Sequence, residues 1–198
     1  MSATGHIRRS AIAAAAAALL SQSSMSASVA GTVHHSSPGT PTVVQEQHVS
    51  VQTLLERGAL DEAVQRAENE RDNPESTYLA AQAFAKMEDG DRAGQQFARL
   101  QETGDDSWKA IGESATLAIS GNTGGAMDAA NRAIAANGDN AYAHYQLGLI
   151  ASRQNNFQRA LAAFERAIEL KPDFAYAHYY AGLASQRIRQ TAKMSMHL

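Results

Sequence analysis

A sequence repeat near the C-terminus is the feature that most limits how this chain can fold. Its first unit covers residues 141–174, and the opening of that unit, AYAHYQLGL, returns at 175–183 as AYAHYYAGL. A short unit that repeats in this way cannot bury its apolar face alone, so neighbouring copies have to stack on one another. The sequence therefore predicts an array built from one supersecondary unit.

The unit at 141–174 predicts two helices joined by a tight turn. Asn155 and Asn156 favour the turn, because asparagine side chains compete for backbone hydrogen bonds and tolerate left-handed geometry. The segment after the turn carries an apolar stripe at helical spacing, formed by Ala160, Phe164, Ala167 and Ile168. Pro172 ends that second helix, since the residue before a proline is pushed out of the helical region.

The order of these residues resembles the tetratricopeptide repeat. Gly148 and Ala160 supply the small residues, Phe164 the aromatic residue and Pro172 the closing proline of that pattern. The resemblance implies an all-α, right-handed α-solenoid of helix-turn-helix repeats, in which small residues let the two helices of a pair approach and Phe164 fills the space beside them. An alanine-rich, proline-poor composition agrees with a helical chain.

Earlier parts of the chain repeat the same signal with a looser period. The second-helix alanines Ala63, Ala93, Ala126 and Ala160 follow one another at lengthening steps, and only the last step equals the full length of the unit at 141–174. The repeat domain is expected at 47–198, with units at about 47–73, 74–106, 107–140 and 141–174 and a partial unit at 175–198. Solenoids normally close with a polar capping helix, and the partial unit has none. The tail frays, or it pairs with another chain, or the sequence is a truncated form of a longer protein, and we favour truncation.

The N-terminal segment has a different composition from the repeats. Residues 1–45 contain no Asp or Glu, and two arginines at positions 8 and 9 precede the apolar run 11–20. This order predicts a secretory signal peptide at 1–30, with cleavage after Ala30, followed by a flexible linker at 31–46. An organellar transit peptide and a disordered alanine tract remain alternatives.

The export signal implies a periplasmic or secreted protein. The apolar run is shorter than the roughly 20 residues that a membrane-spanning helix needs, so no membrane span is expected after cleavage. The formal net charge of −3 does not indicate the basic surface that nucleic-acid-binding proteins carry, so nucleic-acid binding is not expected.

No pattern in the sequence indicates an enzyme, a cofactor or a metal site. The chain has no cysteine, which excludes disulfides and thiol chemistry, and it lacks the common catalytic and phosphate-binding motifs. His144 and His178 recur with the repeat, and equivalent positions lie about a helix diameter apart, too far to share one metal ion. Packing or groove lining is the role expected for both.

Aromatic residues accumulate in the first helices of the later units, and five of the six tyrosines fall between positions 142 and 180. The resemblance implies that these positions line the concave face of the solenoid and bind a protein or peptide partner. The predicted partner-binding residues are Tyr78, Trp108, Ile111, Tyr142, Tyr145, Arg153, Tyr176, Tyr179 and Arg187. The alternative is that the rings simply pack between adjacent helices.

Tyr, Leu and Ile occupy the places where some members of the family carry a Lys/Asn clamp for a C-terminal carboxylate. We therefore expect an extended peptide with apolar and some acidic side chains. The function predicted is a non-enzymatic interaction scaffold of the periplasm or cell envelope that assists complex assembly. A regulatory or accessory subunit of an envelope enzyme is the alternative, and the partner and the oligomeric state stay open.

Overall fold

The computed structural model describes residues 49–195, and these residues fold as nine α-helices and no strand. The helices are α2 (Val51–Glu56), α3 (Leu60–Asn69), α4 (Pro74–Lys86), α5 (Gly90–Leu100), α6 (Asp106–Ile119), α7 (Thr123–Ala136), α8 (Ala141–Arg153), α9 (Phe157–Leu170) and α10 (Ala175–Ser195). The prediction of an all-α helical repeat is confirmed. The expected signal peptide at 1–30 and the linker at 31–46 lie outside the described residues.

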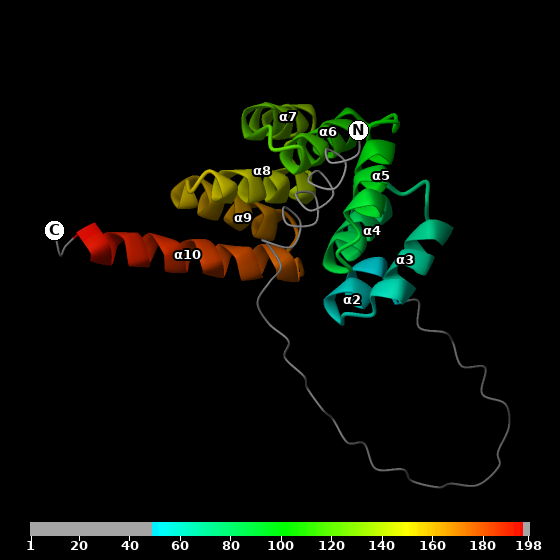
Figure 1. Ribbon diagram of the computed structural model, residues 1–198, viewed down its shortest axis with the longest axis horizontal. Coiled ribbons are helices and arrows are strands. Elements are labelled where there is room, and N and C mark those ends of the chain that lie inside the picture. Colours follow the sequence, from blue (N-terminus) through cyan, green and yellow to red (C-terminus); the bar gives the residue numbers. More distant parts are fainter. Residues whose placement is uncertain (1–48, 196–198) are drawn as a thin grey trace, which may run out of the picture.

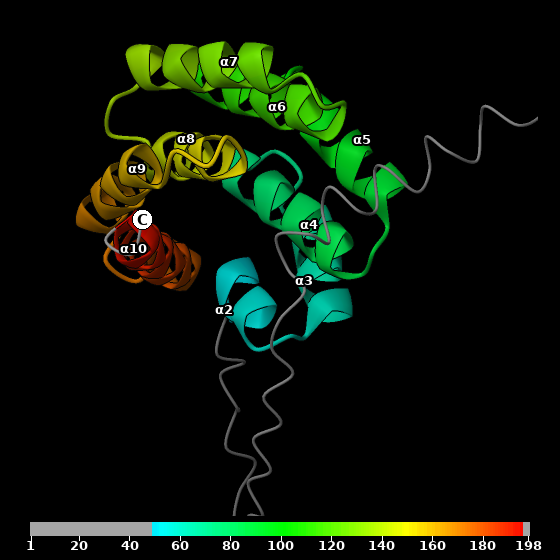
Figure 2. The ribbon, with the colours of Figure 1, turned by 60° about the vertical axis from the view of Figure 1, so that its left-hand side comes forward.

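Successive helices pack in pairs, α2 with α3, α4 with α5, α6 with α7, and α8 with α9, and the pairs stack along a curved path (Figures 1 and 2). Short polar side chains fix where most helices begin. Asparagine, aspartate or serine side chains at the N-caps accept hydrogen bonds from backbone N–H groups of the first turn, at Ser50, Asn73, Asp89, Asp105, Asn122, Asn140 and Asn156. Each cap satisfies a donor that the helix itself leaves unpaired.

One left-handed residue turns the chain inside every pair. These residues are Gly58, Glu88, Gly121 and Asn155, with φ values of 76°, 60°, 83° and 58°. Each stands five positions before a buried second-helix alanine, so the turns recur in the same register as those alanines. The sequence places the second turn near Gly90, but Gly90 begins α5 and the left-handed residue is Glu88.

Small residues face large ones where α8 meets α9, as the sequence predicts. Phe164 is fully buried, and a Cβ atom added to Gly148 would lie 2.5 Å from its Cε1 atom. In the preceding pair Ser114 takes the place of Gly148, and its hydroxyl donates a 2.8 Å hydrogen bond to the carbonyl oxygen of Ala126. Both solutions let two helix backbones approach closely.

The curvature brings the two ends of the array together. The Nε2 atom of Gln52 in α2 donates a hydrogen bond to the carbonyl oxygen of Asp173 at 2.9 Å, and the Tyr176 hydroxyl donates to the carbonyl oxygen of Leu55 at 3.3 Å. In Figure 2, α4, α8 and α10 border the inside of the curve, while α5, α7 and α9 lie outside. Among the described helices, none combines the length and the apolar character needed to cross a lipid bilayer.

Candidate functional site

The inner face, formed by the first helix of each pair and by α10, carries all nine residues that the sequence predicts as partner-binding. Their exposure divides them into three groups. Tyr78, Ile111, Tyr142 and Tyr145 are buried; Trp108, Arg153 and Tyr176 are half-buried; Tyr179 and Arg187 are exposed. All nine positions thus lie on the helices at the inside of the curve, but only some of them meet solvent.

The buried rings form one aromatic cluster along the inner face. The ring centroids of Tyr78 and Tyr142 lie 5.3 Å apart, and Trp108 lies 5.3 Å from Tyr142. Phe174, which directly precedes α10, contacts Tyr142 at 4.8 Å and Tyr145 at 4.7 Å. Edge-to-face and tilted pairs at such distances are favourable beyond the area that they bury. These rings therefore hold neighbouring pairs together in this conformation.

The hydroxyl groups of the cluster have partners on distant helices. Tyr78 donates to Oε1 of Gln146 at 3.0 Å, and Tyr142 donates to Oε1 of Glu75 at 2.8 Å. The ammonium group of Lys171 lies 3.4 Å from the same Glu75 oxygen. Polar bonds thus connect α4 with α8 and with the loop before α10, in addition to the ring contacts.

Burial raises the pKa of five of the tyrosines and so favours their neutral form. Desolvation, with a smaller contribution from the charge of Glu56, raises the pKa of Tyr176 from 10.0 to about 12. Burial also raises the pKa of Tyr78, Tyr142, Tyr145 and Tyr180. A raised pKa in the folded state means that ionisation favours unfolding.

We expect the free energy of unfolding to fall as the pH rises. The contribution of Tyr176 is fully present below its unfolded-state pKa of 10.0 and is lost between about pH 10 and pH 12. Urea denaturation followed by circular dichroism at pH 8, 10 and 11, together with tyrosinate absorbance, will measure this loss. A free energy of unfolding that stays constant through that range would contradict the buried placement of the rings.

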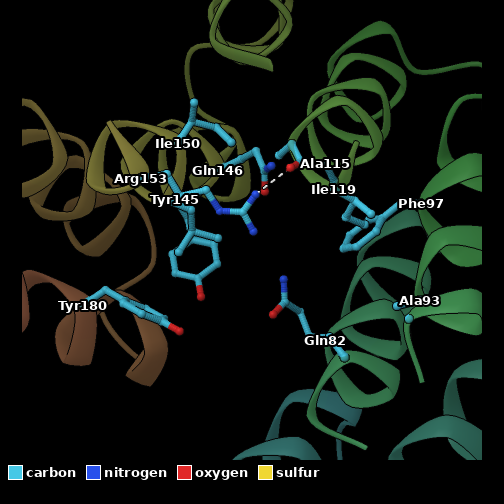
Figure 3. A pocket seen from close by; sticks show the side chains of 14 residues that line it. Gln82, Ala93, Phe97, Ala115, Ile119, Tyr145, Gln146, Ile150, Arg153 and Tyr180 are labelled. Carbon is cyan, nitrogen blue, oxygen red and sulfur yellow. Dashed lines mark hydrogen bonds between the residues drawn. The ribbon is translucent and has the colours of Figure 1, made fainter. Parts of the chain in front are cut away.

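The inner face retains a pocket where α4, α5, α6, α8 and α10 converge. Gln82, Tyr145, Gln146, Arg153 and Tyr180 extend into the same space, above apolar walls (Figure 3). The pocket has a volume of about 60 Å³, more than the roughly 10–15 Å³ that one water molecule needs. It can therefore accept a small group of a ligand without rearrangement.

Arg153 is the charged group of this pocket. Its Nη1 atom donates a 2.8 Å hydrogen bond to the carbonyl oxygen of Ala118 at the end of α6. Burial lowers the pKa of Arg153, while the nearby Tyr180 hydroxyl acts in the opposite direction. The guanidinium group is thus held in place beside the pocket, where a cation suits an acidic or carbonyl group of a ligand.

Sequence reasoning did not single out Gln146 and Tyr180. They stand at equivalent positions of α8 and α10, one full repeat apart, and both line the pocket. Tyr180 also stacks on Phe164 with ring centroids 5.7 Å apart. The sequence signal for Gln146 and Tyr180 is their repeat position, because each directly follows a tyrosine that is predicted to line the inner face.

The recurring histidines close the loops before their helices. Nε2 of His144 donates to the carbonyl oxygen of Gly138 at 2.9 Å, and Nε2 of His178 does the same to Pro172 at 2.9 Å. Across the part of the chain that the structure describes, no group of three or more metal-ligating side chains comes together.

Comparison with known proteins identifies one repeat directly. Residues 141–174 match the family model of the tetratricopeptide repeat. No curated protein matches the sequence at a significant level.

Solved structures of MamA are similar to the chain at a low level. One MamA crystal structure is 22% identical over 69% of this chain and 82% of that chain, with a TM-score of 0.41. The MamA RS-1 ArsTM double mutant gives 24% identity over 74% and 85%, with a TM-score of 0.42. MamA from residue 41 onward, from Desulfovibrio magneticus RS-1, gives 20% identity over 74% and 92%, with a TM-score of 0.38. These scores are too low to carry function from one protein to another.

Proposed function

Because the chain is a tetratricopeptide-repeat protein, we propose that it is a non-enzymatic scaffold that binds a peptide segment of a partner protein on its inner face. Stacked helix pairs of this kind present an extended concave surface, which suits a polypeptide ligand better than a small molecule. The proposal includes a role in assembling a larger complex.

The observation that carries the proposal is the exposure of large apolar side chains on α10. Tyr179 is 45% exposed and Leu183 is 38% exposed, and both stand at inner-face positions of the repeat. Exposed Arg187 follows one turn later. Tyrosine and arginine often dominate the binding energy of protein interfaces, so this part of the inner face has the composition of a binding surface.

The pocket extends this surface toward the centre of the array. The ring of Tyr179 lies 5.2 Å from that of Tyr180, which lines the pocket together with Arg153. A segment lying along α10 can therefore place apolar side chains on Tyr179 and Leu183 and a small acidic group near Arg153. This agrees with the expected ligand, an extended peptide with apolar and some acidic side chains.

Alanine at both Tyr179 and Arg187 is expected to abolish partner capture while preserving the fold. Both side chains are exposed, so their loss leaves little of the core disturbed, and the affinity should fall about 30-fold or more if either is a binding hot spot. The measurement is affinity capture from cell-envelope extract with mass spectrometry, with helicity checked by circular dichroism.

A double variant on α9, Arg159→Ala with Glu165→Ala, is the matched control, since both side chains are also exposed. Undiminished capture by the Tyr179/Arg187 variant would contradict the inner-face assignment. Stoichiometric recovery of an enzyme would instead favour the accessory-subunit alternative.

The place where the scaffold works is proposed from the sequence alone. The leader pattern at 1–30 supports export, and hence a periplasmic or secreted protein.

A further inference from the structure

Two helices of the array begin with nearly the same sequence but have differently covered surfaces. The segments AYAHYQLGL of α8 and AYAHYYAGL of α10 align residue by residue. Tyr145 is 2% exposed, whereas its counterpart Tyr179 is 45% exposed. Gly148 is buried, whereas its counterpart Gly182 is exposed.

Helix α9 covers this surface of α8 and places the aromatic ring of Phe164 on it. Phe164 of α9 lies over Gly148, and a Cβ atom added to Gly148 would lie 2.5 Å from the Phe164 ring. The centroid of the Phe164 ring lies 5.8 Å from that of Tyr145. A Cβ atom added to Gly182 would meet no heavy atom within 4 Å. Within residues 49–195, α10 thus presents the same acceptor for an aromatic ring with nothing inserted into it.

The charge on α10 limits what can cover this surface. Residues 175–198 contain no Asp or Glu, while Arg187 and Arg189 are exposed. The chain as a whole has a net charge of −3, so this basic helix differs from the rest of the molecule. Opposite charges at the rim of an interface favour association and select partners, which points to an acidic occupant.

We propose that α10 docks one amphipathic, acidic helix of a partner protein, with an aromatic side chain of that helix inserted against Gly182. The docking surface consists of His178, Gly182, Gln186 and Arg189, which lie at helical spacing on one side of α10, with Tyr179 at its border with the inner face. This surface takes a helix, as α8 does, and does not depend on the binding of an extended segment to the inner face. The docked helix would pack on α10 in the same way that α9 packs on α8.

A synthetic peptide provides a direct probe. It has the sequence of α9 with Arg159→Glu and Arg166→Glu, which keeps the aromatic ring and makes the helix acidic. Fluorescence anisotropy with the full chain should show binding that weakens as the ionic strength rises. The same peptide with Phe164→Ala should bind at least about tenfold more weakly, because the ring is the group that fills the acceptor.

The Gly182→Leu variant tests the surface on the protein. Leucine fills the space that the ring needs, so peptide affinity should fall at least about tenfold, while the fold is kept because nothing lies within 4 Å of the added Cβ atom. Gly94→Leu in α5 is the matched control, since an added Cβ atom there also meets nothing within 4 Å, and it should leave the affinity unchanged.

Three results would overturn the proposal. Equal binding by Gly182→Leu and the unaltered chain would place the peptide elsewhere, for example on α8 after displacement of α9. Equal binding by the two peptides would show that the aromatic ring of the peptide is not inserted against Gly182. A dimer in sedimentation velocity that Gly182→Leu abolishes, and that the peptide does not dissociate, would make a second copy of this chain the occupant. Gly182→Leu leaves Tyr179 and Arg187 in place, so a loss of peptide affinity in this variant concerns the docking surface and not the inner-face residues.

Discussion

Replacing Phe164 with alanine is expected to lower the free energy of unfolding by about 3–5 kcal/mol. The side chain is fully buried and connects three helices, because it lies over Gly148 in α8 and its ring centroid lies 5.7 Å from that of Tyr180 in α10. Its removal leaves a cavity that rigid helix backbones cannot collapse to fill. Against a typical total of about 5–15 kcal/mol for a folded protein, this is a large loss.

Urea denaturation followed by circular dichroism measures the effect, read as a lower midpoint with an unchanged slope. Phe157→Ala is the matched control, since Phe157 begins the same helix but is only half-buried, and it should cost clearly less. A Phe164 variant within about 1 kcal/mol of the unaltered protein would mean that the ring does not organise this part of the core.

The helix pairs could be predicted because their determinants are local. The buried alanine of each second helix and the left-handed residue five positions before it are both set within one unit, as Ala160 and Asn155 show. Asparagine or glycine at such a position signals the turn. Glu88 gives no such signal, and the turn is indicated in the sequence only by the nearby Gly90, which begins α5.

The exposure of the inner face could not be predicted in the same way. Whether Tyr142 is open or buried depends on how far the array curves, and curvature is the sum of small rotations between repeats. Its hydrogen bond to Glu75 spans 67 residues of sequence, and the contact of Gln52 with Asp173 spans 121. Spacing within a unit holds no information about such distant contacts. Partner binding at the nine inner-face residues therefore remains a prediction.

Gly112 is a second case in which the contact between pairs, and not the repeat pattern, decides the residue. It is the counterpart of Gln146 in α8 and of Tyr180 in α10, so the register alone does not indicate a small residue. In the structure a Cβ atom added to Gly112 would lie 2.5 Å from the carbonyl oxygen of Phe97 and 2.7 Å from Cβ of Leu100. Both atoms belong to or adjoin the backbone of α5, which cannot turn aside as a flexible side chain can.

We expect Gly112→Ala to lower the free energy of unfolding by about 1–3 kcal/mol through overpacking. This loss should prevail over the gain of about 1 kcal/mol that alanine usually brings to a helix interior.

Gly182→Ala provides the opposite case, because an added Cβ atom at that helical position meets nothing within 4 Å. It should therefore raise the free energy of unfolding by about 0.5–1 kcal/mol. Urea midpoints of the two variants, measured side by side, should move in opposite directions. If both variants stabilise the protein, α5 and α6 are farther apart than the structure places them, because the same substitution can change sign only where a neighbouring backbone blocks the added methyl group.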